Sequence, residues 1–169
     1  AFARITKSQD VAAAKDCDLV IEAIVEDLEV KKTLFKTLGH TVKPAGSLAS
    51  NTTSFPIGEL ARASGRPDRV IGLHFFNPVQ LMKLVEVVAT KETAPDVLAA
   101  AREYAGKVGK TPVTASDTPG FIVNRLLVPY LAEALRMLER GEATKQDIDT
   151  AMTLGTGHPM GPITLLDYV

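Results

Sequence analysis

The sequence predicts an α/β protein in which part of a parallel β-sheet is followed by an all-helical segment. Over residues 19–115, short apolar runs alternate with runs of helical periodicity, which is typical of βαβ units. From residue 117 onward the periodicity is helical throughout. We therefore expect two domains, residues 1–116 and residues 117–169.

The expected strands of the first domain are apolar runs separated by helix caps and turn residues. Residues 19–25 have the near-continuous hydrophobicity of a central parallel strand. Asp27 is then placed to cap a helix that ends at Gly39. Residues 1–18 suggest a strand fragment and a short helix. The other strands are expected at 47–50, 70–73, 84–88 and 111–115, and the other helices at 57–63 and 94–108.

The helical segment opens with Asp117-Thr-Pro-Gly and continues as a long helical pattern over residues 121–140. Thr144 and Asp147 have the spacing of a capping box, so a second helix is expected after them. A third helix is expected after Pro162, and the chain is expected to stop inside it.

Polar side chains follow three of the expected strands at the point where each strand ends. Glu26 follows the first strand, Asn51 and Thr53 follow the second, and His74 ends the third. Open α/β sheets bind their ligands along the carboxyl edge of their strands. We therefore expect a ligand site at this edge of the sheet.

Glu86 is a carboxylate in the middle of an apolar run. An unpaired buried charge is costly, so Glu86 needs a partner, and His74 is the nearest candidate that can carry a positive charge. An imidazole oriented by a buried carboxylate is an arrangement for general acid/base catalysis. The alternative is that His74 caps a strand and that Glu86 faces solvent on an edge strand.

The segment His-Phe-Phe-Asn-Pro at 74–78, followed by Lys-Leu-Val-Glu-Val-Val at 83–88, resembles the signature of the 3-hydroxyacyl-CoA dehydrogenases. The resemblance covers nearly all of residues 16–169. It implies the second half of a Rossmann-type NAD-binding domain followed by the first part of the family's helical C-terminal domain. Because the chain has no Gly-x-Gly-x-x-Gly turn, we expect the glycine-rich half to be missing and NAD binding by this segment alone to be poor.

The resemblance implies NAD-dependent oxidation of (S)-3-hydroxyacyl-CoA to 3-oxoacyl-CoA, as in β-oxidation of fatty acids or butanoate metabolism. His74 would be the catalytic base and Glu86 would orient it. Asn124, within the matching segment 117–125, would contribute to the substrate site. Thr53 stands where many members have serine, so it would keep the hydroxyl that touches substrate and cofactor. The positions implied on the cofactor side are Glu26, Lys31, Thr53 and Asn77.

Several of these residues also have simpler interpretations. Lys31 would be an exposed lysine, Asn77 a turn former, and Asn124 one polar residue on an amphipathic helix. For the whole chain, the alternatives are a non-catalytic fragment or scaffold and a related β-hydroxyacid dehydrogenase. Members of the latter group usually have a catalytic lysine, whereas the His74 and Glu86 pair favours the acyl-CoA type.

Composition excludes several classes of function. The net charge of −1 gives no basic footprint for nucleic acid, and no apolar run has the length of a membrane span. A single cysteine excludes an internal disulfide, and no cluster has metal-ligand spacing. The resemblance implies an acyl-CoA substrate, a homodimer formed through the helical domain, and a location in the cytoplasm or the mitochondrial matrix.

Overall fold

The computed structural model describes residues 2–168 and divides into two compact units, Ala1–Phe121 and Ile122–Val169. The first unit is α/β and the second is helical, in keeping with the sequence-based fold class. The domain boundary expected after residue 116 stays a prediction. No helix of residues 2–168 is long and apolar enough to cross a bilayer.

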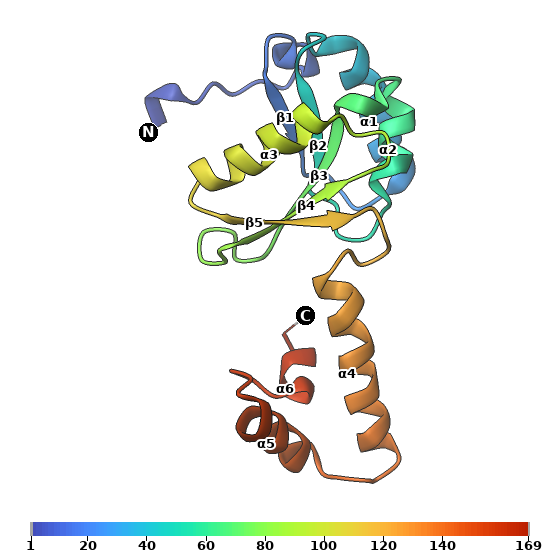
Figure 1. Ribbon diagram of the computed structural model, residues 1–169, viewed down its shortest axis with the longest axis vertical. Helices are drawn as coiled ribbons and strands as arrows, with labels where there is room; N and C mark the ends of the chain where they lie inside the picture. Colours follow the sequence, from blue (N-terminus) through green and yellow to red (C-terminus); the bar gives the residue numbers. More distant parts are fainter. Residues whose placement is uncertain (1, 169) are drawn as a thin grey trace. The chain divides into compact units, whose positions relative to one another are not determined.

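The first unit contains one five-stranded sheet in the order β1-β2-β3-β4-β5 (Figure 1). Strands β1 to β3 are mutually parallel, β4 is antiparallel to β3, and β5 is parallel to β4. The strands are β1 (Leu19–Glu22), β2 (Ser47–Ser50), β3 (Val70–Phe75), β4 (Leu84–Ala89) and β5 (Thr111–Ser116).

The expectation of a parallel sheet holds for β1 to β3, but β4 and β5 run in the opposite direction. Only residues 76–83 connect β3 to β4, and they contain Asn77-Pro78. A parallel pair needs a crossover of about a dozen or more residues, so this connection can only reverse the chain. The reversal brings the middle of β4 beside the carboxyl end of β3.

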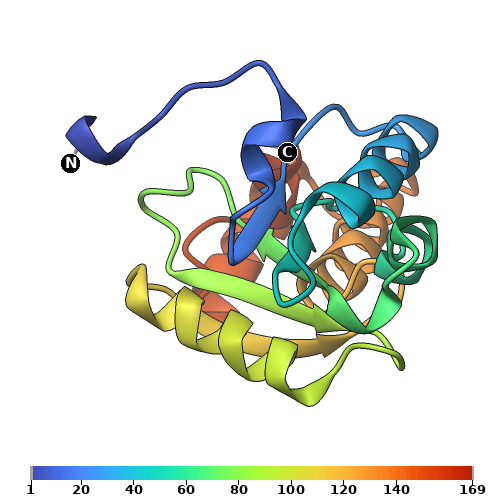
Figure 2. The ribbon, with the colours of Figure 1, turned by 90° about the horizontal axis from the view of Figure 1, so that it is seen from above.

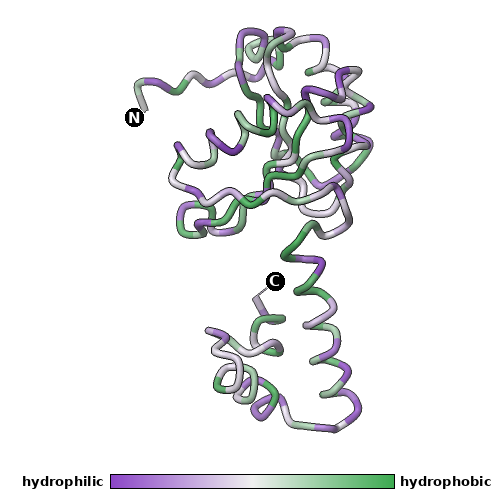
Figure 3. The backbone as a smooth tube through the Cα atoms, in the orientation of Figure 1, coloured by the Kyte–Doolittle hydropathy of each residue, from purple (hydrophilic) through white to green (hydrophobic). Residues whose placement is uncertain are grey.

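Helices cover both faces of the sheet (Figure 2). Helices α1 (Leu28–Thr41) and α2 (Ile57–Ser64) pack on one face, where Val70 of β3 is buried, and α3 (Pro95–Lys107) packs on the other, where Ile71 is buried. This alternation follows from the two-residue period of a strand. Hydrophobic stretches accordingly run along the strands (Figure 3).

Local caps place these helices where the sequence indicates. The Asp27 side chain accepts a hydrogen bond from Val30 N at 3.0 Å, which confirms the expected start of α1. Between residue 2 and β1, the chain forms two short 3₁₀ helices, Phe2–Arg4 and Val11–Ala14, and no strand. The strand fragment expected within residues 1–18 is therefore wrong.

The second unit consists of α4 (Val123–Glu139), α5 (Lys145–Thr156) and α6 (Pro162–Leu166). Thr144 caps α5 as expected, with its Oγ1 accepting a hydrogen bond from Asp147 N. Helix α6 ends at Leu166, so the expectation that it continues to the end of the chain is wrong. A small apolar core holds the three helices together through Ala134, Ile148 and Ile163.

Candidate active site

His74 and Glu86 form a buried hydrogen-bonded pair. They lie directly opposite each other in the β3–β4 register, and His74 Nδ1 is 2.8 Å from Glu86 Oε2. Only 4% of His74 and 1% of Glu86 is exposed. The pairing expected from the sequence is confirmed, and the alternative in which Glu86 faces solvent on an edge strand is wrong, because β4 lies between β3 and β5.

The hydrogen bond assigns the protons of the imidazole. An ionised carboxylate only accepts hydrogen bonds, so Nδ1 of His74 is the donor. In the neutral ring the lone pair is then on Nε2. This tautomer is the one that a histidine needs in order to accept a proton at Nε2 while a carboxylate holds the other nitrogen.

Two aromatic rings pack beside the imidazole. The ring centroids of Phe76 and Phe121 are 4.5 Å and 5.6 Å from that of His74. Phe76 belongs to the motif that begins at His74, but the sequence analysis assigned it no role, and Phe121 was expected only as the start of a helix. Both rings add apolar contact to a group that the sequence identified by its place at a strand end, its charge partner and its motif.

Side-chain hydrogen bonds tie together the carboxyl ends of the three parallel strands. Glu26, after β1, accepts hydrogen bonds from Thr52 Oγ1 at 2.5 Å and from Thr53 N at 3.1 Å, both after β2. Asn51 Oδ1 accepts a hydrogen bond from Phe75 N of β3 at 2.8 Å. Glu26, Asn51 and the Thr53 backbone therefore link the ends of neighbouring strands, whereas the His74 side chain bonds to Glu86.

Lys31 is buried beneath Glu26. Its Nζ is 2.6 Å from Glu22 Oε1 and 3.1 Å from Glu26 Oε2, and only 1% of its side chain is exposed. Ser50 donates a further hydrogen bond to Glu22 at 2.6 Å. The interpretation of Lys31 as an ordinary exposed lysine is wrong.

Glu22 and Ser50 are residues that the sequence analysis missed. Glu22 lies within an apolar run, as Glu86 does, so the rule that a buried carboxylate needs a partner applies to it equally. That rule would have directed attention to Lys31 of the following helix. Ser50 gave no such signal, because a serine near a strand end is common.

The surroundings of Glu26 favour its ionised form. Partial burial raises the pKa of this carboxyl, but hydrogen bonds from Thr52 and Lys31 and the positive charge of Lys31 outweigh burial, so the pKa of Glu26 is lowered. Its side chain remains 39% exposed. Glu26 is therefore an oriented, negatively charged group that a ligand at the sheet edge can reach.

The other candidate residues differ in their exposure and in their position in the fold. Thr53 and Asn77 are exposed after β2 and β3, and Asn124 is half-buried in the first turn of α4, within the second unit. Their contacts with cofactor or substrate stay predictions. His40 and His158, which lie outside the motif, are exposed. Residues 2–168 contain no group of side chains suited to hold a metal ion.

Comparison with models of known protein families tests the family resemblance that the motif suggests. Residues 1–118 match the family model for the "3-hydroxyacyl-CoA dehydrogenase, NAD binding domain". Residues 120–169 match the model for the "3-hydroxyacyl-CoA dehydrogenase, C-terminal domain". The chain belongs to the 3-hydroxyacyl-CoA dehydrogenase family.

Individual members of this 3-hydroxyacyl-CoA dehydrogenase family are similar over nearly the whole chain. A mitochondrial hydroxyacyl-coenzyme A dehydrogenase of Sus scrofa is 57% identical over 98% of the chain, which covers 53% of that protein. A probable 3-hydroxybutyryl-CoA dehydrogenase of Deinococcus radiodurans is 51% identical over 98% of the chain and 60% of that protein. The chain thus spans little more than half the length of these relatives.

Solved structures of the family agree with the fold. The (S)-3-hydroxybutyryl-CoA dehydrogenase PaaH1 from Ralstonia eutropha superposes with a TM-score of 0.96 at 41% identity, over 99% of this chain and 59% of that one. FadB2 of M. tuberculosis gives a TM-score of 0.92 at 49% identity, over 96% of this chain and 57% of that one. The antiparallel turn into β4 therefore belongs to a fold that is shared with members of known structure.

Proposed function

We propose that the protein carrying this chain oxidises (S)-3-hydroxyacyl-CoA to 3-oxoacyl-CoA with NAD, in β-oxidation or butanoate metabolism. The observation that carries the proposal is the buried hydrogen bond between His74 Nδ1 and Glu86 Oε2. It lies within residues that match the family's NAD-binding domain. Names of relatives such as 3-hydroxybutyryl-CoA dehydrogenase support the substrate class.

In the proposed reaction, His74 accepts the proton of the substrate's 3-hydroxyl group at Nε2. Glu86 keeps the imidazole in the required tautomer and stabilises the imidazolium that forms. Phe76 and Phe121 place apolar rings beside the imidazole. The Thr53 hydroxyl and the Asn124 carboxamide would bind the substrate.

The residues at the sheet edge fit a dinucleotide. NAD, when bound, supplies the acceptor for the hydride that leaves C3 of the substrate. Glu26 is ionised and accessible, and Thr53 and Asn77 are exposed beside it along the edge where such sheets bind ligands. Lys31 is held by two carboxylates, so its proposed part is to fix Glu26 from beneath.

The assembly and location follow the same proposal. We propose a homodimer formed through the helical domain, and exposed apolar side chains on α4 and α5, such as Leu126 and Leu154, support an interface there. A mitochondrial relative supports the matrix as the compartment if the organism is a eukaryote, and the cytoplasm is proposed otherwise.

The test is a pair of matched histidine variants in a full-length protein carrying this chain. His74→Gln removes the base, and we expect it to lower kcat for 3-hydroxybutyryl-CoA by about 10²–10⁴-fold. His40→Gln makes the same change at an exposed position of α1 and should leave kcat unchanged. NADH formation is measured by absorbance. Full activity in His74→Gln would overturn the proposed chemistry.

A further inference from the structure

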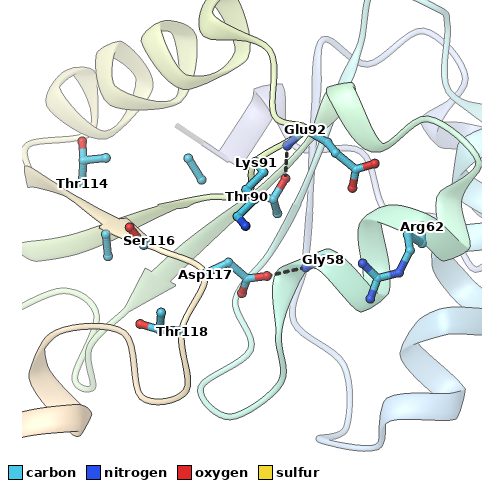
Figure 4. A pocket seen from close by; sticks show the side chains of 11 residues that line it. Gly58, Arg62, Thr90, Lys91, Glu92, Thr114, Ser116, Asp117 and Thr118 are labelled. Carbon is cyan, nitrogen blue, oxygen red and sulfur yellow. Dashed lines mark hydrogen bonds between the residues drawn. The ribbon is translucent and has the colours of Figure 1, made fainter.

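Asp117 caps a helix that begins far from it in the sequence. Its Oδ1 accepts a hydrogen bond from Ile57 N at 2.7 Å, and its Oδ2 accepts one from Gly58 N at 2.8 Å. Figure 4 shows the carboxylate, at the end of β5, directed at Gly58 in the first turn of α2. Both residues of α2 that Asp117 contacts lie in the first unit, as Asp117 itself does.

The sequence of α2 requires an external cap. The first N–H groups of a helix have no partner inside the helix, and the N-cap residue Pro56 makes no side-chain hydrogen bond. A carboxylate at this position also interacts favourably with the helix dipole. Gly58 leaves room for it, because a Cβ atom there would lie 3.1 Å from Asp117 Oδ2.

This cap occupies the N-terminus of α2 at the wall of a cavity. Asp117 lines a cavity of about 800 Å³ together with residues of α2, β5 and the segment after β4 (Figure 4). Because both oxygens of the carboxylate are bound to N–H groups of α2, an anionic ligand in the cavity finds this helix end occupied. The contact is therefore an anchor between chain segments.

The anchored segment leads directly to the imidazole. Phe121 N donates a hydrogen bond to Thr118 O at 2.9 Å, which closes a turn after Asp117. Gly120 and Phe121 both have positive φ values, 78° and 49°. Such a φ is unusual for a bulky residue and persists only where the surroundings determine it. The Phe121 ring is buried, 5.6 Å from the His74 ring between centroids.

We propose that Asp117 is a positioning residue for His74. By binding the N-terminus of α2, it fixes the turn at 117–121. This turn keeps the backbone of Phe121 at its unfavourable positive φ and so holds the Phe121 ring against the imidazole. Without this anchor, Phe121 relaxes to an ordinary φ and withdraws, and the His74 ring gains freedom and water contact. The inference rests on the proposed role of His74 as the base.

A second carboxylate in the protein provides a matched control. Asp149 caps α6 in the same way, accepting hydrogen bonds from Ile163 N at 2.8 Å and Thr164 N at 3.0 Å. It lies in the second unit, in α5. Asp117→Asn and Asp149→Asn therefore both replace a two-oxygen acceptor by a side chain that presents one oxygen and one NH₂ group.

The experiment compares these two variants in a full-length protein carrying this chain. We expect both to lower Tm. Only Asp117→Asn should also lower kcat, by about 10- to 100-fold with little change in KM, because misplacement of a catalytic group acts on the chemical step. The NMR cross-peak between the Phe121 and His74 rings should weaken in Asp117→Asn and persist in Asp149→Asn.

Several outcomes would overturn the proposal or separate it from the proposed function. If Asp117→Asn lowers Tm but keeps kcat and the cross-peak, Asp117 only stabilises the fold and the proposal is wrong. If Asp117→Asn does not fold, Gly58→Ala replaces it, since its Cβ presses on the carboxylate while alanine favours the helix. Unchanged kcat and cross-peak in that variant would also overturn the proposal. The cross-peak tests positioning even if His74→Gln shows that His74 is not the base.

Discussion

Among residues 2–168, ionisable side chains are buried in two clusters, one beside β1 and one between β3 and β4, and the two clusters are built differently. In the first, Lys31 is bound by two carboxylates, and Glu22 is bound in turn by Lys31, Ser50 and Ile24 N. In the second, Glu86 binds His74 at Nδ1, and Nε2 has no hydrogen-bond partner among residues 2–168.

This difference in hydrogen bonding indicates that the Lys31 cluster stabilises the fold and that the His74 and Glu86 pair can react. A buried ion that is bound on all sides is costly to disturb and has no atom left for a substrate. An imidazole that is bound at one nitrogen is held in position while its other nitrogen can accept a proton. The two clusters should therefore respond to mutation in different measurements, the first in folding stability and the second in catalytic rate.

The largest effect is expected from Glu86→Gln. Glutamine keeps the shape and accepts a hydrogen bond, but it removes the charge that stabilises an imidazolium formed in the transition state. We expect kcat to fall by about 10²–10⁴-fold with a modest change in KM. Steady-state kinetics of a full-length protein carrying the substitution provide the measurement.

Two further variants sharpen this prediction. Glu103→Gln makes the same change at an exposed ion pair on α3 and should leave kcat unaltered. The double variant of His74→Gln and Glu86→Gln should lose little more than the worse single variant, because the two residues act as a unit. An unaltered kcat in Glu86→Gln would mean that the His74 and Glu86 pair only stabilises the fold, as the Lys31 cluster does.

The next effect concerns the Lys31 cluster. Lys31→Met leaves Glu22 buried without its counter-charge, so we expect a loss of about 3–5 kcal/mol in the free energy of unfolding. Adding Glu22→Gln removes the stranded charge and should restore part of the loss. Lys32→Met, at a neighbouring lysine with more exposed ion pairs, should cost much less, because solvent screens exposed charges. Equal losses in urea unfolding of Lys31→Met and Lys32→Met would contradict the comparison.

Local sequence patterns predicted much of this structure. Apolar runs, caps and breakers predicted the strands and helices of the sheet, and the charge at Glu86 within an apolar run predicted its partner His74. The expected extent of the first strand was too long, since β1 ends at Glu22. Glu22 lies within that run, and the reasoning that paired Glu86 with His74, applied to Glu22, would have predicted a buried cation such as Lys31.

What the sequence could not predict depends on distant pairings. The cap on α2 joins Asp117 to Ile57, and no local spacing connects two such positions. The positive φ of Phe121 could not be predicted either, since the residue type itself disfavours that conformation. The reversal into β4 was predictable in principle, because its connection is too short for a parallel crossover.

The smallest effect is a pH dependence of stability that originates at Glu26. The pKa of this carboxyl is lowered in the folded protein, since hydrogen bonds from Thr52 and Lys31 outweigh the opposing effect of burial. A group with a lowered pKa stabilises the fold above its unfolded-state pKa, here 4.5, and loses that contribution as pH falls through the lower folded-state value.

Glu26→Gln removes this contribution and leaves the hydrogen-bonding shape of the site in place. We expect the difference in unfolding free energy between the unmodified protein and Glu26→Gln to be constant near neutral pH and to shrink below pH 4.5. Its size should be less than about 1 kcal/mol, because the side chain is partly exposed and solvent screens its charge. Urea unfolding of both proteins over a pH series provides the measurement. A difference that stays constant below pH 4.5 would mean that Glu26 is not held as an ion by Lys31, and the Lys31 cluster would then consist of the Glu22 pair alone.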